Sequence, residues 1–455
     1  GLFRIDALPC EPALASARAK LASARTDVES LRADYRVALA DAFGDRMKGL
    51  KDKIKPLQDA ELIDYEKAAS LKMDILKTAF SRFDPDTSED FLAYVKSEGE
   101  ALERYAVFMA IGGHLRKDNW QDWTMELQDP ESSAVKTFTE EHKNEILFYE
   151  FLQWLIDGQL KEAADAAKGM KIGIYGDLAV GSSGGGSDAW GDKGVFAFGA
   201  SAGAPPDAFN PNGQDWGFPP LIPEKLRENG YGLFIQTIRG NLKHAGALRI
   251  DHALGLFRLF YVPDGMSPAE GVYVKYPSDD LLRIIALESV RAKAAIIAED
   301  LGTVPTEVKN RLMEFGMLSY RLFYFEKKWP QRDVLPPRDY PPMALTSVTT
   351  HDLPTLWGFW GGRDIEVKRR VGIYGDEAVF KRDLEERGAD RRLMLEALRE
   401  LLPQGFQHDA ASVPEMTPEL MFAIYKYLAL TPCKLVSVGL DDIAGELDQQ
   451  NLPGT

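Results

Sequence analysis

The chain has 455 residues and a net charge of −16, with 45 % hydrophobic and 10 % aromatic residues. This composition is that of an ordinary globular protein, and the length fits one barrel with insertions or two domains. The negative charge argues against nucleic acid and anionic membranes as partners, and no apolar run reaches the roughly 20 residues that span a bilayer. The two cysteines give no disulfide framework, which favours a cytoplasmic location.

The first third of the chain has a helical pattern. Apolar residues recur at spacings of three, four and seven over residues 12–60, and residues 65–80 and 91–111 continue this pattern. Such stripes predict packing faces between helices. Trp120 and Trp123 follow in a turn-like segment, where they either stack on sugar or anchor the helices by hydrophobic packing.

A helix–strand unit begins near residue 144. The apolar periodicity predicts a helix over residues 144–169, followed by a short strand at residues 171–175 that leads into Gly176 and Asp177. This order is typical of a parallel α/β architecture. Asp177 is a candidate acceptor for sugar hydroxyls; alternatively, it caps a turn or pairs with a neighbouring strand end.

A proline-bracketed segment between residues 205 and 220 carries amides around a tryptophan. Asn210 and Gln214 offer hydrogen-bond partners, and Trp216 offers a flat apolar surface of the kind that packs under a sugar ring. The segment is therefore a candidate binding loop. The alternative is a rigid proline-lined loop that buries its tryptophan.

Three later runs of apolar or β-branched residues each end in an acid. Residues 247–251 end at Asp251, residues 294–299 at Glu299, and residues 345–352 at Asp352. Intervals of this length leave room for returning helices, which predicts a barrel with catalytic groups at the carboxyl ends of its strands. Six strands are predicted in all, starting near Lys171, Ala247, Ala294, Leu318, Leu345 and Leu435.

Two carboxylates facing each other across a cleft suit glycosyl transfer. Arg249 lies two positions before Asp251, on the same side of the strand, where its charge keeps the aspartate ionised. Asp300 faces away from Glu299, so a structural role is expected for it. Two other readings remain open at this point: a structural Asp–Arg pair at a strand end, and a magnesium-dependent lyase with a carboxylate cluster.

The chain resembles the amylomaltases, which are the 4-alpha-glucanotransferases or disproportionating enzymes of the alpha-amylase-like glycosidases. The matching motifs lie at residues 176–177, 203–207, 213–217, 249–252, 298–302, 350–352 and 451–455. The resemblance implies a (β/α)8 TIM barrel with helical insertions. Residues 1–11 and 144–455 would form the barrel, and residues 12–143 a helical insertion subdomain.

The resemblance also implies that the barrel extends beyond both ends of this chain. Residues 1–6 resemble a piece that the family carries after its first two barrel strands. We therefore expect those strands to be missing here, together with a C-terminal part. A barrel without two strands exposes unpaired edges, so we expect the chain alone to be unstable or inactive.

The resemblance finally implies a reaction and its residues. Asp251 would be the nucleophile, Glu299 the acid and base, and Asp352 the third acid that holds sugar hydroxyls. The expected substrate-binding residues are Arg249, His351, Asp177, Gln214, Trp216 and His252. The substrates would be alpha-1,4-glucans and maltooligosaccharides, with no cofactor and no catalytic metal, because no two histidines have metal-site spacing. An alpha-glucan hydrolase and an inactive glucan-binding protein are the alternatives.

Overall fold

The computed structural model describes residues 46–60, 62–206, 212–374, 376–399, 401 and 413–452. The chain forms two compact units, residues 1–89 and 90–455. In the first unit, the described helices are α2 (Arg46–Gln58) and α3 (Tyr65–Phe80). The helix predicted before residue 46 and the barrel segment predicted at residues 1–11 lie outside the described residues. No helix in the described part of the chain is long and apolar enough to cross a membrane.

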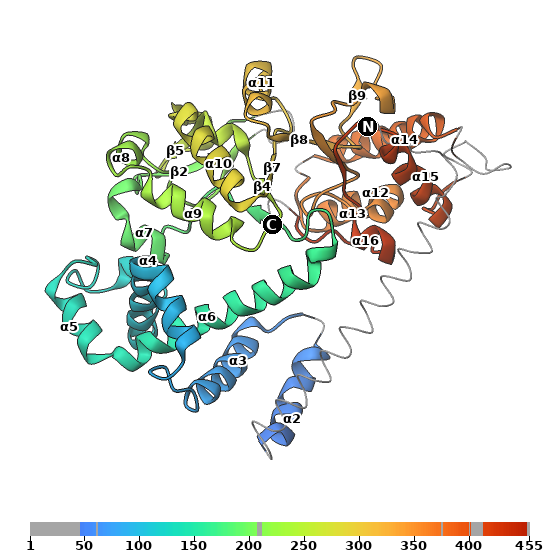
Figure 1. Cartoon of the computed structure of the whole chain (residues 1–455). Helices are drawn as coiled ribbons and strands as arrows, with labels where there is room; N and C mark the ends of the chain where they lie inside the picture. The colour runs from blue at the N-terminus through green and yellow to red at the C-terminus, as the bar shows by residue number, and fades with distance from the viewer. Residues whose placement is uncertain are drawn as a thin grey trace. The chain divides into compact units, whose positions relative to one another are not determined.

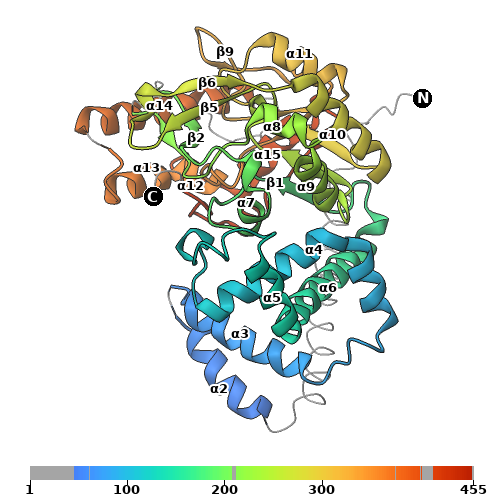
Figure 2. The ribbon, with the colours of Figure 1, turned by 90° about the vertical axis from the view of Figure 1, so that its left-hand side faces the viewer.

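The second unit combines helices with three sheets (Figures 1 and 2). Its helices are α4 (Glu89–Leu115), α5 (Ser133–Glu141), α6 (Lys143–Ala166), α7 (Ser187–Gly191), α8 (Pro223–Glu228), α9 (Gly232–Leu242), α10 (Ser278–Ala292), α11 (Thr306–Glu314), α12 (Leu356–Gly361), α13 (Arg363–Arg370), α14 (Glu377–Ala397), α15 (Pro418–Ala429) and α16 (Leu440–Ala444). Its strands are β1 (Tyr175–Leu178), β2 (Ala200–Ala204), β3 (Gln214–Asp215), β4 (Ala247–Ile250), β5 (Arg258–Pro263), β6 (Val272–Lys275), β7 (Ala295–Ala298), β8 (Leu318–Leu322), β9 (Lys327–Lys328), β10 (Asp333–Val334), β11 (Ala344–Ser347) and β12 (Leu435–Val436).

The main sheet has six parallel strands in the order β1-β4-β7-β8-β11-β12. The strands follow one another in chain order, as they do in a (β/α)8 barrel, and helix α10 returns the chain from β4 to β7. All six predicted strands are present; five start within one residue of the predicted position, and the first starts later. Parallel alignment brings the carboxyl ends of all six to one edge, which is where the predicted acids lie.

Alternation along β4 separates an inner from an outer layer of side chains. Ala247 packs with Ile297, Tyr320 and Leu345 in the core cluster that the main strands share. Leu248 belongs to the cluster formed with helices α9, α10 and α11. Because side chains alternate along a strand, Arg249 is on the same side as Ala247 and extends the inner layer toward the carboxyl edge.

The first strand of the sheet begins later than predicted. The sequence pattern places it at residues 171–175, but β1 covers Tyr175–Leu178. Gly173 has φ +75°, a left-handed conformation that interrupts extended backbone. As a consequence, Asp177 lies within the strand rather than after it, directly opposite Arg249 of β4.

A second, antiparallel sheet has the order β3-β2-β5-β6 and carries Gln214 on its edge strand. Gly203 of β2 pairs with Asp215 of β3. A Cβ atom at Gly203 would lie 2.1 Å from the carbonyl oxygen of Gln214, so only glycine lets the two strands approach this closely. Asn210, predicted to belong to the same binding segment, lies outside the described residues.

Helices α4, α5 and α6 pack around an aromatic core. Trp120 and Trp123 are only 7 % and 4 % exposed, and both belong to this core. The Trp120 indole donates to the carbonyl oxygen of Gly184 at 2.9 Å, which ties the helices to the loop before α7. Of the two readings for these tryptophans, hydrophobic anchoring is correct. The proposed division into a barrel and an insertion at residues 12–143 stays a prediction.

Candidate active site

Arg249 is the centre of the polar group at the carboxyl end of β4. Its side chain is buried, and one guanidinium nitrogen contacts both carboxylate oxygens of Asp177, at 2.7 and 2.9 Å. A second nitrogen lies 2.5 Å from Oδ1 of Asp251. One buried cation therefore fixes two carboxylates on neighbouring strands. The predicted pairing of Arg249 with Asp251 is confirmed. Asp177 forms an ion pair with Arg249 of the neighbouring strand, which was one of the alternatives expected for it.

Glu299 follows β7 on the strand next to β4. Its backbone N–H donates to the carbonyl oxygen of Ile250 at 3.0 Å, which places its side chain beside the end of β4. Its carboxylate accepts from the backbone N–H of Leu301 at 2.8 Å and from that of His252 at 3.0 Å. Both carboxylate oxygens are thus held by the chain itself, which fixes the orientation of the carboxylate.

The pKa of Glu299 is raised above the ordinary value of a glutamate. Burial is the largest cause; the Leu301 N–H opposes it, and the negative charge of Asp251 raises the pKa further. Asp251, in contrast, is paired directly with a guanidinium. A raised pKa is what a proton donor requires, and this sets Glu299 apart from the ion-paired Asp251.

This difference predicts the alkaline side of the pH–rate profile. If Glu299 is the proton donor, kcat/KM falls as pH rises through its pKa, and the midpoint lies above the ordinary pKa of a glutamate. The measurement is kcat/KM against pH for wild type and for the residual activity of Glu299→Gln. The variant is expected to lack this decline. An identical alkaline decline in both proteins would assign it to another group.

His252 turns the chain directly after the nucleophile candidate. Its φ is +45°, in the left-handed region, and its ring is largely buried, which lowers its pKa. The ring of Trp216 meets it edge to face at 5.1 Å, and the Trp216 indole donates to the side-chain oxygen of Gln214 at 2.9 Å. The structure thus brings Gln214 of β3, and Trp216 directly after this strand, to the end of β4, although the two segments are separated in sequence.

Asp352 is held by a separate set of residues after β11. Its carboxylate accepts from the side-chain amide of Asn451 at 2.6 Å and lies 3.2 Å from Nε2 of His351. The amide of Gln449 donates to its carbonyl oxygen at 3.3 Å. In the described part of the chain, no hydrogen bond or ion pair joins Asp352 to Arg249, Asp177 or Asp251. Asn451 was not predicted as a site residue. It lies in the motif at residues 451–455 that resembles the family, but the motif does not indicate that Asn451 contacts Asp352.

Asp300 has the structural role expected for it. Its side chain is buried and accepts from the hydroxyl of Ser319 at 2.5 Å and from the backbone N–H of Tyr320 at 3.1 Å. These contacts tie the end of β7 to the beginning of β8. The residue next to Glu299 therefore fixes the strand, while Glu299 itself stays available for chemistry.

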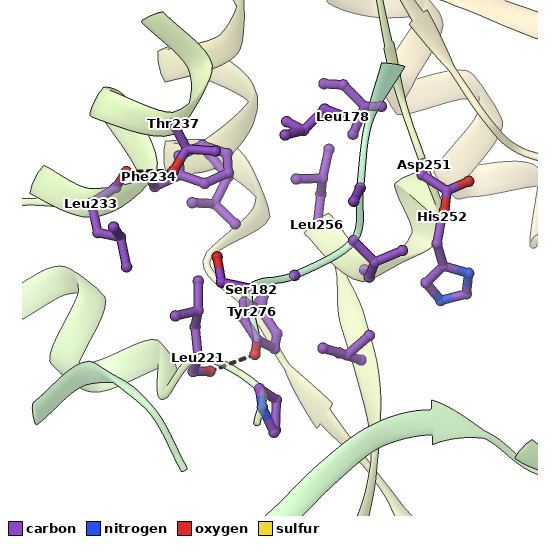
Figure 3. A pocket seen from close by; sticks show the side chains of 18 of the residues that line it. Leu178, Ser182, Leu221, Leu233, Phe234, Thr237, Asp251, His252, Leu256 and Tyr276 are labelled. Carbon is purple, nitrogen blue, oxygen red and sulfur yellow. Dashed lines mark hydrogen bonds between the residues drawn. The ribbon is translucent and has the colours of Figure 1, made fainter. Parts of the chain in front are cut away.

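A pocket of about 170 Å³ opens beside Asp251 and His252 (Figure 3). The side chains that line it come mainly from the loop after β1, the segment before α8, helix α9 and residues 250–259 at and after the end of β4, and most of them are apolar. Among the described residues of its wall, Asp251 is the one with a charged side chain, and Figure 3 shows it across the pocket from Phe234 and Thr237. The apolar wall offers few partners for sugar hydroxyls, so the polar groups around Arg249 are the better candidate for substrate contact.

These features define a barrel-type α/β protein with two acids of different environment at the ends of neighbouring strands. The family model described as 4-alpha-glucanotransferase matches residues 19–455, and the chain belongs to that family. It is 37 % identical over 431 residues to a 4-alpha-glucanotransferase of Haemophilus influenzae, over 90 % of this chain and 61 % of that protein. It is 39 % identical over 372 residues to the one of Mycobacterium tuberculosis, over 80 % and 50 % of the two chains.

Solved structures agree with this assignment. The crystal structure of amylomaltase from Corynebacterium glutamicum matches with a TM-score of 0.74 and 34 % identity, covering 85 % of this chain and 53 % of that one. The amylomaltase from Streptococcus agalactiae in complex with acarbose matches with a TM-score of 0.71 at 19 % identity, which supports the fold alone. The predicted family and barrel fold are confirmed. The chain spans 61 % and 50 % of the length of these two relatives.

Proposed function

We propose that the protein transfers alpha-1,4-glucan segments between maltooligosaccharides, as a retaining 4-alpha-glucanotransferase. The observation that carries this proposal is the pair formed by guanidinium-bound Asp251 and partly buried Glu299 at the ends of adjacent strands. A retaining enzyme needs one carboxylate as nucleophile and one carboxyl as proton donor, about 5 Å apart. Neighbouring barrel strands can supply that separation. The membership of the chain in the family supports the same reaction.

The proposed reaction has two steps. Asp251 attacks the anomeric carbon of the donor while Glu299 protonates the departing glycosidic oxygen, which leaves a covalent β-glucosyl–enzyme. The hydroxyl of an acceptor sugar then loses its proton to Glu299 and displaces Asp251. Each step inverts the anomeric centre, so the product keeps the α configuration.

The remaining site residues are proposed to bind the substrate. Asp177 is partly exposed and already anchored by Arg249, so its free edge can accept hydrogen bonds from sugar hydroxyls. Asp352 and His351 are proposed to hold hydroxyls of the same sugar, with Asn451 fixing the carboxylate. A carboxylate here also stabilises the positive charge that develops on the sugar ring.

A metal-dependent lyase is less well supported than glycosyl transfer. The cation that lies between Asp177 and Asp251 is the guanidinium of Arg249, so it occupies the place between these carboxylates that a metal ion would need. Among the described residues, the one group of three side chains spaced to share a metal ion lies elsewhere and contains two histidines, which magnesium does not favour. If a chelator such as EDTA abolished the activity of the protein, the metal-dependent lyase would be supported instead.

The proposed function is tested with maltotriose as the sole substrate. Transfer yields glucose together with longer maltooligosaccharides, and the total of reducing ends hardly increases, because each bond broken is replaced by a bond formed. Chromatography of the products and a reducing-end assay measure the two quantities. Shorter products alone, with reducing ends rising in step with glucose, would identify a hydrolase. Binding of maltooligosaccharide without turnover would identify a binding protein.

Trp216→Ala is expected to lower transfer more than hydrolysis. A correctly held acceptor reacts with an effective molarity of roughly 10⁵ M or more, which is what lets it outcompete water. Trp216 is half-buried, packs against His252 and hydrogen-bonds to Gln214, so its loss removes one wall of the proposed acceptor site. The ratio of new reducing ends to glucose released should rise at least several-fold. Trp329→Ala, at an exposed tryptophan, is the control and should leave the ratio unchanged.

A further inference from the structure

Three helix termini meet on the surface of the helical region, and each carries a side chain that can bind metal. His114 lies in the last turn of α4. His142 is at once the C-cap of α5 and the N-cap of α6, and Glu145 lies in the first turn of α6. Figure 2 shows α4, α5 and α6 as neighbouring helices. Residues from three helices thus converge at one point, and none of them takes part in the proposed reaction.

The donor atoms of these residues are close together. The distance from Nδ1 of His142 to Oε2 of Glu145 is 2.9 Å, and the two imidazole rings lie 4.7 Å apart between centroids. One ligand atom from each of the three residues can be chosen so that all lie within 4.8 Å of one another. In the described part of the chain, no hydrogen bond engages the ring of His114. Its nitrogen lone pair is therefore available.

Phe138 of α5 contacts both rings. It stacks on His142 at 4.1 Å with an interplanar angle of 18°, and it meets His114 edge to face at 5.6 Å. Phe138 is itself buried in the aromatic core of the helical region. The two imidazoles are therefore supported by a rigid apolar wall on one side, with their exposed edges turned toward solvent. A ligand set supported in this way loses little entropy when it binds an ion.

We propose that His114, His142 and Glu145 form a binding site for a divalent transition-metal ion, with Zn²⁺ as the representative ion. Two imidazoles and one carboxylate are ligands that zinc accepts at about 2.0 to 2.2 Å, and a water molecule would complete the tetrahedron. Ligand atoms of a tetrahedral site lie about 3.3 Å apart, so the observed spacing needs only side-chain rotations. Such rotations are possible because His114 is exposed and the Glu145 side chain is 52 % exposed.

The bound ion would link α4 to the junction of α5 and α6. It replaces the direct contact between His142 and Glu145 and adds His114, so that one ion joins two segments that are separated in sequence. Because the unfolded chain does not hold these three side chains together, binding favours the folded helical region. The site is independent of the proposed glucan transfer, and its test uses no activity measurement.

The test is a titration of untagged, chelator-treated protein with Zn²⁺ alone, by calorimetry, together with Co²⁺ as a spectroscopic probe. We expect one equivalent to bind, a visible Co²⁺ spectrum of tetrahedral type, and a rise in Tm of several degrees at saturating metal. His114→Gln, His142→Gln and Glu145→Gln should each weaken binding at least about tenfold. Glu145→Gln alters an exposed side chain and keeps the test valid if a histidine variant fails to fold.

His244→Gln is the matched control. His244 also contacts a carboxylate, Oδ1 of Asp157, at 2.8 Å, but the group lacks a second histidine. This variant should bind Zn²⁺ as tightly as wild type. The proposal is overturned if wild type binds no Zn²⁺, or if binding is equally strong in wild type and in the folded variants of the three ligands. It is also overturned if His244→Gln alone weakens binding.

Discussion

Asp251→Asn is expected to abolish turnover of maltotriose, by about 10⁴-fold or more, while the protein stays folded. The asparagine amide is isosteric with the carboxylate but cannot form the glycosyl ester, so the first step loses its nucleophile. The change also removes the ion pair with Arg249, whose guanidinium stays bound to both oxygens of Asp177. Circular dichroism and Tm should therefore change little. The measurement is initial glucose release, in enzyme freed of wild-type contamination.

Asp264→Asn provides the control for this substitution. Asp264 is exposed directly after β5, and its backbone N–H donates to the carbonyl oxygen of Gly199 at 3.0 Å; its side chain makes no hydrogen bond or ion pair with any described residue. The Asp264→Asn substitution makes the same chemical change in the same unit of the protein, and the variant should keep full activity. If Asp251→Asn retained more than about one per cent of wild-type activity, the nucleophile would have to be another carboxylate, and Asp177 would be the next to test.

The main sheet could be predicted because each strand obeys a simple local rule. Buried parallel strands are short apolar or β-branched runs, and three of those predicted here are followed by an acid near the carboxyl edge. That rule located Asp251, Glu299 and Asp352 at strand ends. It failed at the start of β1, because a left-handed Gly173 ended the apparent strand and moved Asp177 into the sheet. A glycine conformation of this kind depends on tertiary contacts that a local pattern does not contain.

Contacts between distant segments were beyond prediction from the residues alone. Asn451 holds Asp352 across 99 positions of the chain, and nothing in the spacing of the two residues indicates it. His114 and His142 have no metal-site spacing in sequence, and they come together because α4 and α5 pack on the same aromatic core. Likewise, Trp216 could be marked as a candidate, but its contact with His252 depends on how the second sheet folds over β4.

Glu299→Gln is expected to separate the two steps of the reaction. With maltotriose, the loss of the proton donor should lower turnover by about 10² to 10⁴-fold. With α-glucosyl fluoride, the first step needs no acid, because fluoride leaves as an anion when Asp251 forms its bond to the anomeric carbon. The second step still needs a base to take the proton of the incoming hydroxyl. The glucosyl–enzyme should therefore accumulate and be visible by intact-protein mass spectrometry.

Azide gives the most specific outcome for this variant. Azide is an anionic nucleophile that needs no base, so it should restore release of the glucosyl group from Glu299→Gln and yield α-glucosyl azide, while it leaves wild type nearly unaffected. Asp251→Asn should form no adduct and show no rescue, because it lacks the carboxylate that carries the sugar. Glu307→Gln, at an exposed position in the first turn of α11, should behave as wild type. The opposite outcome is a Glu299→Gln variant that is equally slow on the fluoride and on maltotriose, with no adduct and no rescue by azide. Glu299 would then not transfer the proton. Its role would be to position the backbone of His252 and Leu301 through its two hydrogen bonds.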